Sequence, residues 1–180
     1  SAASDVYKRQ ILKNVSKFSD IFSSFAESFL GVKCSLTYTK YDSTSSIRRF
    51  YPVIDGKIRR SEESLSESQR FFIDHSFRMS ILTFFYQTPT FYIVETPDSS
   101  LDISYEKNAA NVFMRFLNNP NSIIITSNLN NSSFISHLIE RKNVQFSLIG
   151  LLEIAKKSVI QGTSNQLKAI YNNIKERAQL

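Results

Sequence analysis

FYIVETPDSSLD, residues 91–102, is the most informative segment for the fold, and it follows LSESQR, residues 65–70, about 25 residues further along the chain. In the later stretch, an apolar run ends at Glu95, and an acid at the carboxyl end of a buried parallel strand stands where α/β folds bind ligands. In the earlier stretch, Ser66 precedes a helical pattern, so its hydroxyl and the first free N–H groups of the helix can face an anion. The alternative is an ordinary helix cap, in which Ser66 and Gln69 form a capping box. Together they predict an α/β protein that binds an anionic ligand.

Hydrophobic patterning around these stretches predicts strands that alternate with helices. Residues 68–85 are apolar on most sides, which is typical of a buried helix. The continuous apolar runs at 90–95 and 122–126 predict parallel strands that are buried on both faces. A helix over 103–117 separates them, and strand–helix–strand at this spacing predicts a right-handed parallel crossover.

The outer segments add an arm, an antiparallel patch and a C-terminal region. A heptad-like apolar seam predicts a helix that ends at Gly31, a good left-handed cap; it is either the returning end of a coiled-coil arm or an amphipathic helix lying on the domain. Alternating Thr- and Tyr-rich runs predict the antiparallel patch, with a turn at Asp55-Gly56. The seam consists of Ile11, Val15, Phe18, Phe22, Phe25 and Phe29. The remaining predictions are strands at 34–41, 47–53, 57–60 and 144–151 and helices at 134–141 and 164–177.

The composition describes one basic globular domain of 180 residues, with 42% hydrophobic residues, a net charge of +6 and a pI near 9.4. No apolar run reaches the roughly 20 residues that a membrane span needs, so no membrane is expected. Cys34 is the one cysteine, which excludes an intrachain disulfide and favours a reducing, cytoplasmic setting. The densest basic groups, Arg48-Arg49 and residues 57–60, permit contact with nucleic acid.

The order of these elements resembles the C-terminal half of an ABC-type ATPase head. Residues 65–70 are similar to the LSGGQ signature motif, and residues 91–102 are similar to a Walker B strand that runs into a D-loop. The resemblance covers about residues 11–150 and is closest to SMC- and SbcC-like ATPases of DNA repair, chromosome handling and phage defence. It implies a P-loop NTPase-like fold with the arm at 11–31 and the head lobe at 32–180.

The same resemblance implies a role for each matched residue. Ser66 would contact the γ-phosphate of ATP bound on the opposite head, Glu95 would organise Mg²⁺ through its waters, and Asp102 would couple the two sites across a homodimer. Ser127 stands where the family has a phosphate-sensing histidine. The remaining residues of the signature segment are implied as nucleotide-binding: Glu67, Ser68, Gln69 and Arg70.

This sequence departs from the family pattern in ways that bear on catalysis. Glu67 and Ser68 replace both signature glycines, and Thr96 stands in the position of the usual catalytic glutamate. Threonine cannot act as a general base at neutral pH. Hydrolysis is therefore slow, or Glu95 or Asp98 takes that role, or the site binds ATP without efficient turnover.

The chain has no G-x-x-x-x-G-K-[ST] loop to hold ATP phosphates, so we expect it to hydrolyse no ATP without a Walker A half. Residues 1–10 resemble an assembly-derived segment, which suggests a truncated piece of a longer protein. DNA and a nuclease or accessory subunit are the further partners that the resemblance implies. Two alternatives stay open: a non-catalytic basic α/β module that binds nucleic acid or a protein, and a helix-rich scaffold whose motif order is coincidence. The isolated histidines, His75 and His137, are expected to be structural.

Overall fold

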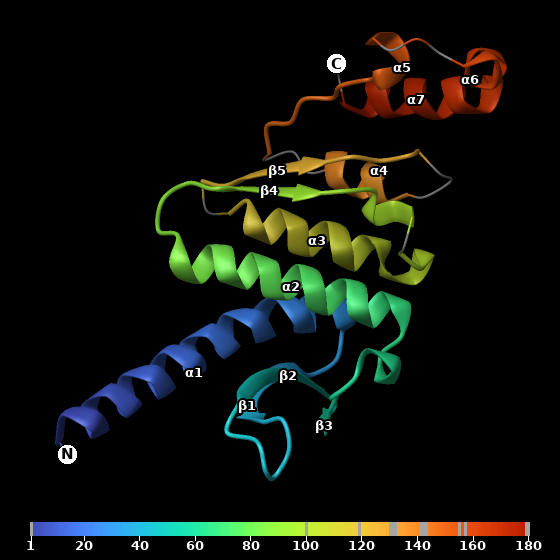
Figure 1. Cartoon of the computed structure of the whole chain (residues 1–180). Coiled ribbons are helices and arrows are strands. Elements are labelled where there is room, and N and C mark those ends of the chain that lie inside the picture. The colour runs from blue at the N-terminus through green and yellow to red at the C-terminus, as the bar shows by residue number, and fades with distance from the viewer. Residues whose placement is uncertain are drawn as a thin grey trace.

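The computed structural model shows a mixed α/β fold in which three helices separate an antiparallel sheet from a pair of parallel strands (Figure 1). The helices at the centre are α1 (Ala2–Leu30), α2 (Glu67–Phe85) and α3 (Glu106–Phe116). The structure describes residues 2–99, 101–118, 120–129, 133–140, 144–154, 156 and 158–178.

Helix α1 begins at Ala2, so residues 2–10 belong to the same helix. That they are an assembly-derived segment stays a prediction. Its first part leaves apolar side chains in solvent: Val6 is 66% exposed and Tyr7 69%. From Phe18 onward the apolar seam is buried in the domain. The amphipathic-helix interpretation therefore holds for the second half, and a coiled-coil partner for the first half stays a prediction.

The helix ends as predicted at Gly31, whose N–H donates to the Glu27 carbonyl at 2.8 Å with φ at +71°. The chain then enters a three-stranded antiparallel sheet of β1 (Cys34–Lys40), β2 (Arg48–Ile54) and β3 (Lys57–Ile58). The Asp55-Gly56 turn between β2 and β3 has positive φ at both residues, as a type I′ hairpin requires. The antiparallel patch is thus confirmed.

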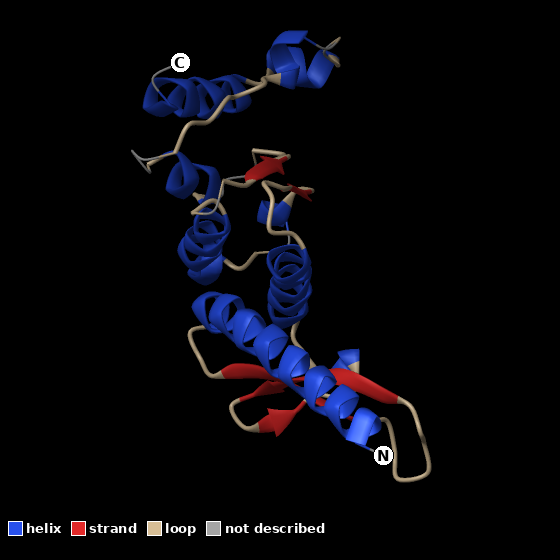
Figure 2. Ribbon diagram, turned by 90° about the vertical axis from the view of Figure 1, so that its left-hand side faces the viewer, coloured by secondary structure: helices blue, strands red, loops and turns tan. Residues whose placement is uncertain are grey.

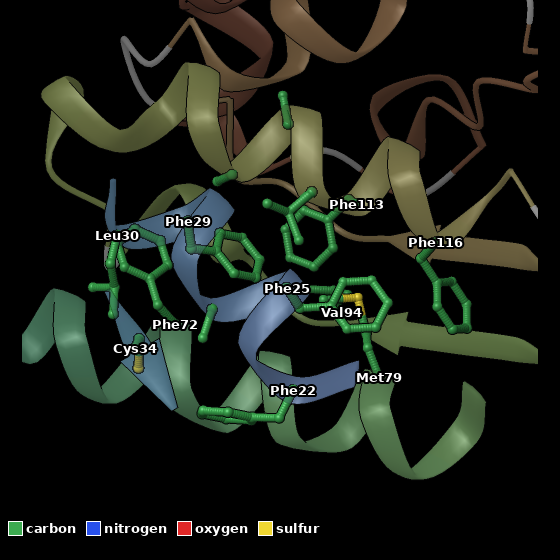
Figure 3. Close-up of a cluster of buried hydrophobic side chains, with 14 of the residues drawn as sticks. Phe22, Phe25, Phe29, Leu30, Cys34, Phe72, Met79, Val94, Phe113 and Phe116 are labelled. Atoms are coloured by element: carbon green, nitrogen blue, oxygen red, sulfur yellow. The ribbon is translucent and has the colours of Figure 1, made fainter. Parts of the chain in front are cut away.

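Aromatic side chains from all three central helices form the core (Figure 3). The ring of Phe29 in α1 stacks on Phe72 in α2 with centroids 4.9 Å apart, and meets Phe113 in α3 edge-on at 5.6 Å. Phe18 and Phe50 extend the core to the sheet. Cys34 lies at the start of β1 with 1% of its surface exposed.

Strands β4 (Phe91–Val94) and β5 (Ser122–Ile125) pair in parallel, with α3 as the connection between them. The prediction that both faces of these strands are buried was wrong. The inward residues Tyr92 and Val94 are buried, whereas Phe91 and Ile93 are 61% and 58% exposed. Helices cover only one face of this pair, and no other described segment covers the opposite face (Figure 2).

The C-terminal region contains α4 (Phe134–Ile139), α5 (Leu151–Ile154), α6 (Val159–Thr163) and α7 (Asn165–Ala178). The predicted helices over 134–141 and 164–177 are confirmed for their described parts. The strand predicted at 144–151 was wrong: residues 144–150 join no ladder, and α5 begins at Leu151. A strand needs a neighbour to accept its backbone hydrogen bonds, and the described chain offers none here. Gly150 instead packs against the ring of Tyr171 in α7.

Candidate functional site

The candidate residues gather on one side of the molecule, where β4 and β5 end and where α2 begins (Figure 1). This follows from topology: α2 runs antiparallel to β4, and α3 returns the chain to the start of β5. The amino ends of α2 and α3 thus lie on the same side as the carboxyl ends of the parallel strands. Ligands bind at such an edge in open α/β folds.

Ser66 is the N-cap of α2 and forms a complete capping box with Gln69. Its Oγ accepts a hydrogen bond from the Gln69 N–H at 3.2 Å, and Gln69 Oε1 accepts one from the Ser66 N–H at 3.1 Å. The first helical bond is donated by Arg70 N–H to the Ser66 carbonyl, so the N–H groups of Glu67 and Ser68 have no acceptor within the helix. The alternative raised by the sequence, an ordinary helix cap, therefore describes the local geometry.

That cap is still compatible with an anion contact. In the capping box the Ser66 hydroxyl acts as an acceptor, so it keeps its own proton for donation. The helix dipole places about half a positive charge at this end. The Glu67 carboxylate, one residue inside the helix, is exposed, as is the guanidinium of Arg70. Ser66 could therefore donate to a phosphate at the surface, with Glu67 free to turn toward solvent.

The residues after β4 are held in a strained turn. Thr96 has φ at +40°, a left-handed conformation that costs a β-branched residue energy and is found where surrounding bonds enforce it. The enforcing bonds come from the end of β5: the Thr96 N–H donates to both the carbonyl and Oγ1 of Thr126, each at 3.0 Å. The turn leaves the Glu95 carboxylate exposed at the strand end. Thr96 therefore acts through its backbone here.

The following segment reverses the chain into α3. Pro97 is buried, and the turn Pro97–Ser99 is closed by Ser99, whose N–H and Oγ both donate to the Thr96 carbonyl. The side chain of Asp98 lies outside the described residues. Asp102 caps the next turn: its Oδ1 accepts bonds from Ser104 Oγ at 2.6 Å and Ser104 N–H at 2.8 Å. These bonds stabilise the ionised carboxylate and lower the pKa of Asp102.

Ser127 lies two residues after the end of β5, next to the Thr126–Thr96 contact, so the structure brings it to the same edge as Glu95. Its Oγ accepts a hydrogen bond from the Leu129 N–H at 3.1 Å. Leu129 also has a positive φ, of +51°. Backbone strain therefore follows both parallel strands, on the side where the candidate residues lie.

Glu106 is a functional candidate that the sequence analysis missed. Its side chain is 1% exposed, and Oε2 accepts bonds from Ser133 Oγ at 2.6 Å and Ser133 N–H at 2.9 Å. The Ser133 hydroxyl also lies 3.3 Å from Nε2 of His137. His137 therefore has a structural role, as expected. Glu106 thereby ties the start of α3 to the segment that follows β5. The available signal was its position on the apolar stripe of α3, three and seven residues before Ala109 and Phe113.

His75 is also structural, as expected. Its Nδ1 lies 2.5 Å from the Tyr92 hydroxyl, and its ring packs beside Phe71 and Phe113. Burial lowers the pKa of His75 to about 4. The contact joins α2 to the buried face of β4.

The described residues contain no group of three or more His, Cys, Asp and Glu side chains placed to hold an ion. Glu95 supplies one exposed carboxylate, and Mg²⁺ is often held by one or two carboxylates together with substrate phosphates.

A hollow of about 210 Å³ lies at the opposite end of β4 and β5, so it does not belong to this edge. It is lined by Thr83, Tyr86, Gln87, Thr88, Pro120 and Asn121. No helix among the described residues is long and apolar enough to cross a bilayer.

Solved structures of SMC heads resemble this chain. One, from a study of "ATP-driven dimerization and DNA stimulated activation of SMC ATPases", superposes with a TM-score of 0.50 at 20% identity, over 86% of this chain and 98% of that one. Another, an SMC head bound to the C-terminal winged-helix domain of ScpA, gives a TM-score of 0.49 at 20% identity. That match covers 74% of this chain, which spans only 39% of that head. No protein-family model and no curated protein sequence matches the chain. The match with a TM-score of 0.50 shows a fold similar to that of SMC ATPase heads, which confirms the expected fold class.

Proposed function

We propose that this chain is the C-terminal half of an SMC-like ATPase head, which binds ATP and Mg²⁺ at a head–head interface and couples that binding to DNA. The observation that carries the proposal is the edge at which β4 and β5 end. The amino end of α2, with Ser66, faces the same side as Glu95 and Ser127. An SMC-head fold with matching motifs at this edge favours the ATPase over the scaffold interpretation.

Each residue would then act through an atom that the structure leaves available. Ser66 would donate its hydroxyl proton to a phosphate of ATP held by the opposite head, in addition to capping α2. Glu95 would accept hydrogen bonds from metal-bound water at the end of β4. Asp102, ionised and held by Ser104, would couple the two nucleotide sites of the head–head dimer. Bound Mg²⁺ would neutralise phosphate charge there.

A Walker A half is the partner that the proposal requires. Parallel sheets occur almost only with both faces covered, whereas one face of the β4–β5 pair is bare. The bare face carries Phe91, Ile93 and Ile124, each more than half exposed. Covering these three side chains would contribute roughly 3–5 kcal/mol. The unpaired segment 144–150 is a second place where a missing strand could pair.

The test joins the chain to a Walker A half and follows ATP-dependent dimerisation by light scattering. Ser66→Arg is expected to abolish dimerisation, because the arginine would occupy the phosphate position. Ser164→Arg is the matched control. Ser164 caps α7 by accepting a 3.2 Å hydrogen bond from the Leu167 N–H, so this variant also loses a helix cap, but one that lies away from the edge where β4 and β5 end. If both variants dimerise like the wild type, the signature segment is only a helix cap.

The alternative, a non-catalytic basic module, is favoured by two specific residues. Thr96 cannot act as a general base in place of a catalytic glutamate. In the structure it contacts Thr126 through its backbone N–H. Ser127 carries no charge for sensing a phosphate. On this alternative the completed head would bind DNA without any nucleotide-driven dimerisation, which the same scattering experiment measures. A buried single thiol is compatible with the cytoplasmic setting that both interpretations assume.

A further inference from the structure

One face of the antiparallel sheet packs against helices, and the other is covered only in part. Phe50 points toward α1 and α2, where its ring contacts Phe18 and Phe77, so the alternate residues of β2 point the other way. Pairing places Arg49 opposite Thr39 and Tyr51 opposite Thr37 on that second face, here called the outer face. Helix α1 crosses the opposite side of the sheet, and no described helix packs across the outer face (Figure 2).

Positive charge concentrates on this part of the chain. Between Lys33 and Arg60 there are seven basic and two acidic side chains, a net charge of +5 in a chain whose net charge is +6. The ion pairs found among the described residues use Arg78, His137, Lys175 and Arg177, all outside this segment. The sheet therefore carries cations that the protein itself does not neutralise.

Two of these cations are held in place on the outer face by tyrosine rings. The Arg49 guanidinium lies 5.1 Å from the ring centroid of Tyr41, and that of Arg60 lies 5.2 Å from Tyr51. Arg60 also donates to the carbonyls of Lys40 and Tyr41, at 3.3 and 3.0 Å. Both arginines stay exposed. Stacked guanidiniums lose less rotamer freedom when they bind, and their planar fork matches a phosphate.

The same geometry distinguishes between kinds of nucleic acid. Unpaired bases bind by stacking on free aromatic rings. Here Tyr51 is only 6% exposed and Phe50 faces the core, whereas Tyr41 is 53% exposed and has the Arg49 guanidinium against its ring. Successive unpaired bases need several free rings, so fixed cations with a single exposed ring beside them suit the phosphate backbone of a double helix better.

We propose that the outer face of the β1–β2–β3 sheet binds the phosphate backbone of duplex DNA, with Arg49 and Arg60 as its fixed contacts. This deepens the proposed coupling to DNA and rests on that part of the proposed function. It needs neither ATP nor a Walker A half, because every residue that it uses lies between Lys33 and Arg60.

The experiment measures fluorescence anisotropy of a labelled 30-base-pair duplex and of the same single strand, titrated with the 180-residue chain without nucleotide at several salt concentrations. We expect tighter binding to the duplex. Arg49→Glu should weaken it roughly tenfold and lower the slope of log K against log salt by about 1. Arg49→Gln should show the same change at smaller size. Circular dichroism checks that both variants are folded.

The matched control is Lys168→Glu, which makes the same charge change on an exposed residue of α7. It should bind the duplex like the wild type. Equal weakening by Lys168→Glu and Arg49→Glu would mean that only net charge matters, and would overturn the proposal. Tighter binding to the single strand, or no binding to either, would also overturn it. This experiment contains no nucleotide and the dimerisation test contains no DNA, so a failed dimerisation test and a failed DNA test remain distinguishable.

Discussion

Gly31 joins the arm helix to the sheet, and Gly31→Ala should lower the stability of the fold. Gly162→Ala, in α6, should raise it. A methyl group at either position meets no atom within 4 Å, so packing contributes nothing to the difference. Gly31 has φ at +71°, whereas Gly162 lies in a helix with no positive φ. The two substitutions therefore isolate backbone conformation.

The expected magnitudes follow from that conformation. An L-residue in the left-handed region costs about 1–2 kcal/mol, partly offset by the smaller entropy of the unfolded chain, so Gly31→Ala should destabilise by about 1 kcal/mol. Gly162→Ala should stabilise by about 0.5–1 kcal/mol, because helical glycine is disfavoured. In a domain of this size 1 kcal/mol shifts Tm by about 2–4 °C.

Thermal unfolding followed by circular dichroism measures both shifts. Gly31→Asn provides a further check, because asparagine tolerates the left-handed region and should lose less than alanine. Shifts of the same sign for the two alanine variants would refute the reasoning, since it would mean that the Gly31 cap does not persist in solution.

Three further predictions concern acid stability, thiol reactivity and ATP turnover. His75 is neutral in the folded state with a pKa of about 4, below its unfolded value near 6.5, so the unfolded chain binds the extra proton and stability falls as pH drops through that window. The loss should approach about 3 kcal/mol in urea titrations at pH 4, and His75→Gln should flatten the profile. Burial raises the pKa of Cys34 to about 12, so a thiol reagent should react with the unfolded protein and not with the native one at pH 8. The chain alone should show no ATP turnover, and a measured rate that disappears in Glu95→Gln would contradict the need for a Walker A half.

Much of the fold could be read from local patterns because its elements have strong local causes. The cap at Gly31, the Asp55-Gly56 turn and the Ser66–Gln69 capping box each depend on a few neighbouring residues, and the structure has all three. The parallel pairing of β4 and β5 followed from the spacing of strand, helix and strand. The predictions failed where a neighbour was required: residues 144–150 have no strand to pair with in the described chain.

The candidate site divides in the same way. Residue types pointed to Ser66 and Glu95, and the resemblance to ABC-type heads implied Asp102 and Ser127. The structure places the strand ends and helix starts that carry them on one side. Their roles toward a nucleotide stay predictions. Glu106 was missed because an acid within an apolar stripe reveals its partner only when α3 and the segment after β5 meet in space.

The order of most helices and strands, the caps and turns, and the motif set can be read from the sequence, because they depend on periodicity and on side chains within a few residues. Which surfaces remain bare depends on the tertiary structure. The open face of β4 and β5, the strained turn at Thr96 and the stacked arginines of the outer face all arise from contacts between residues distant in the chain. Burial and strain are properties of packing, so they become visible only when those segments are brought together.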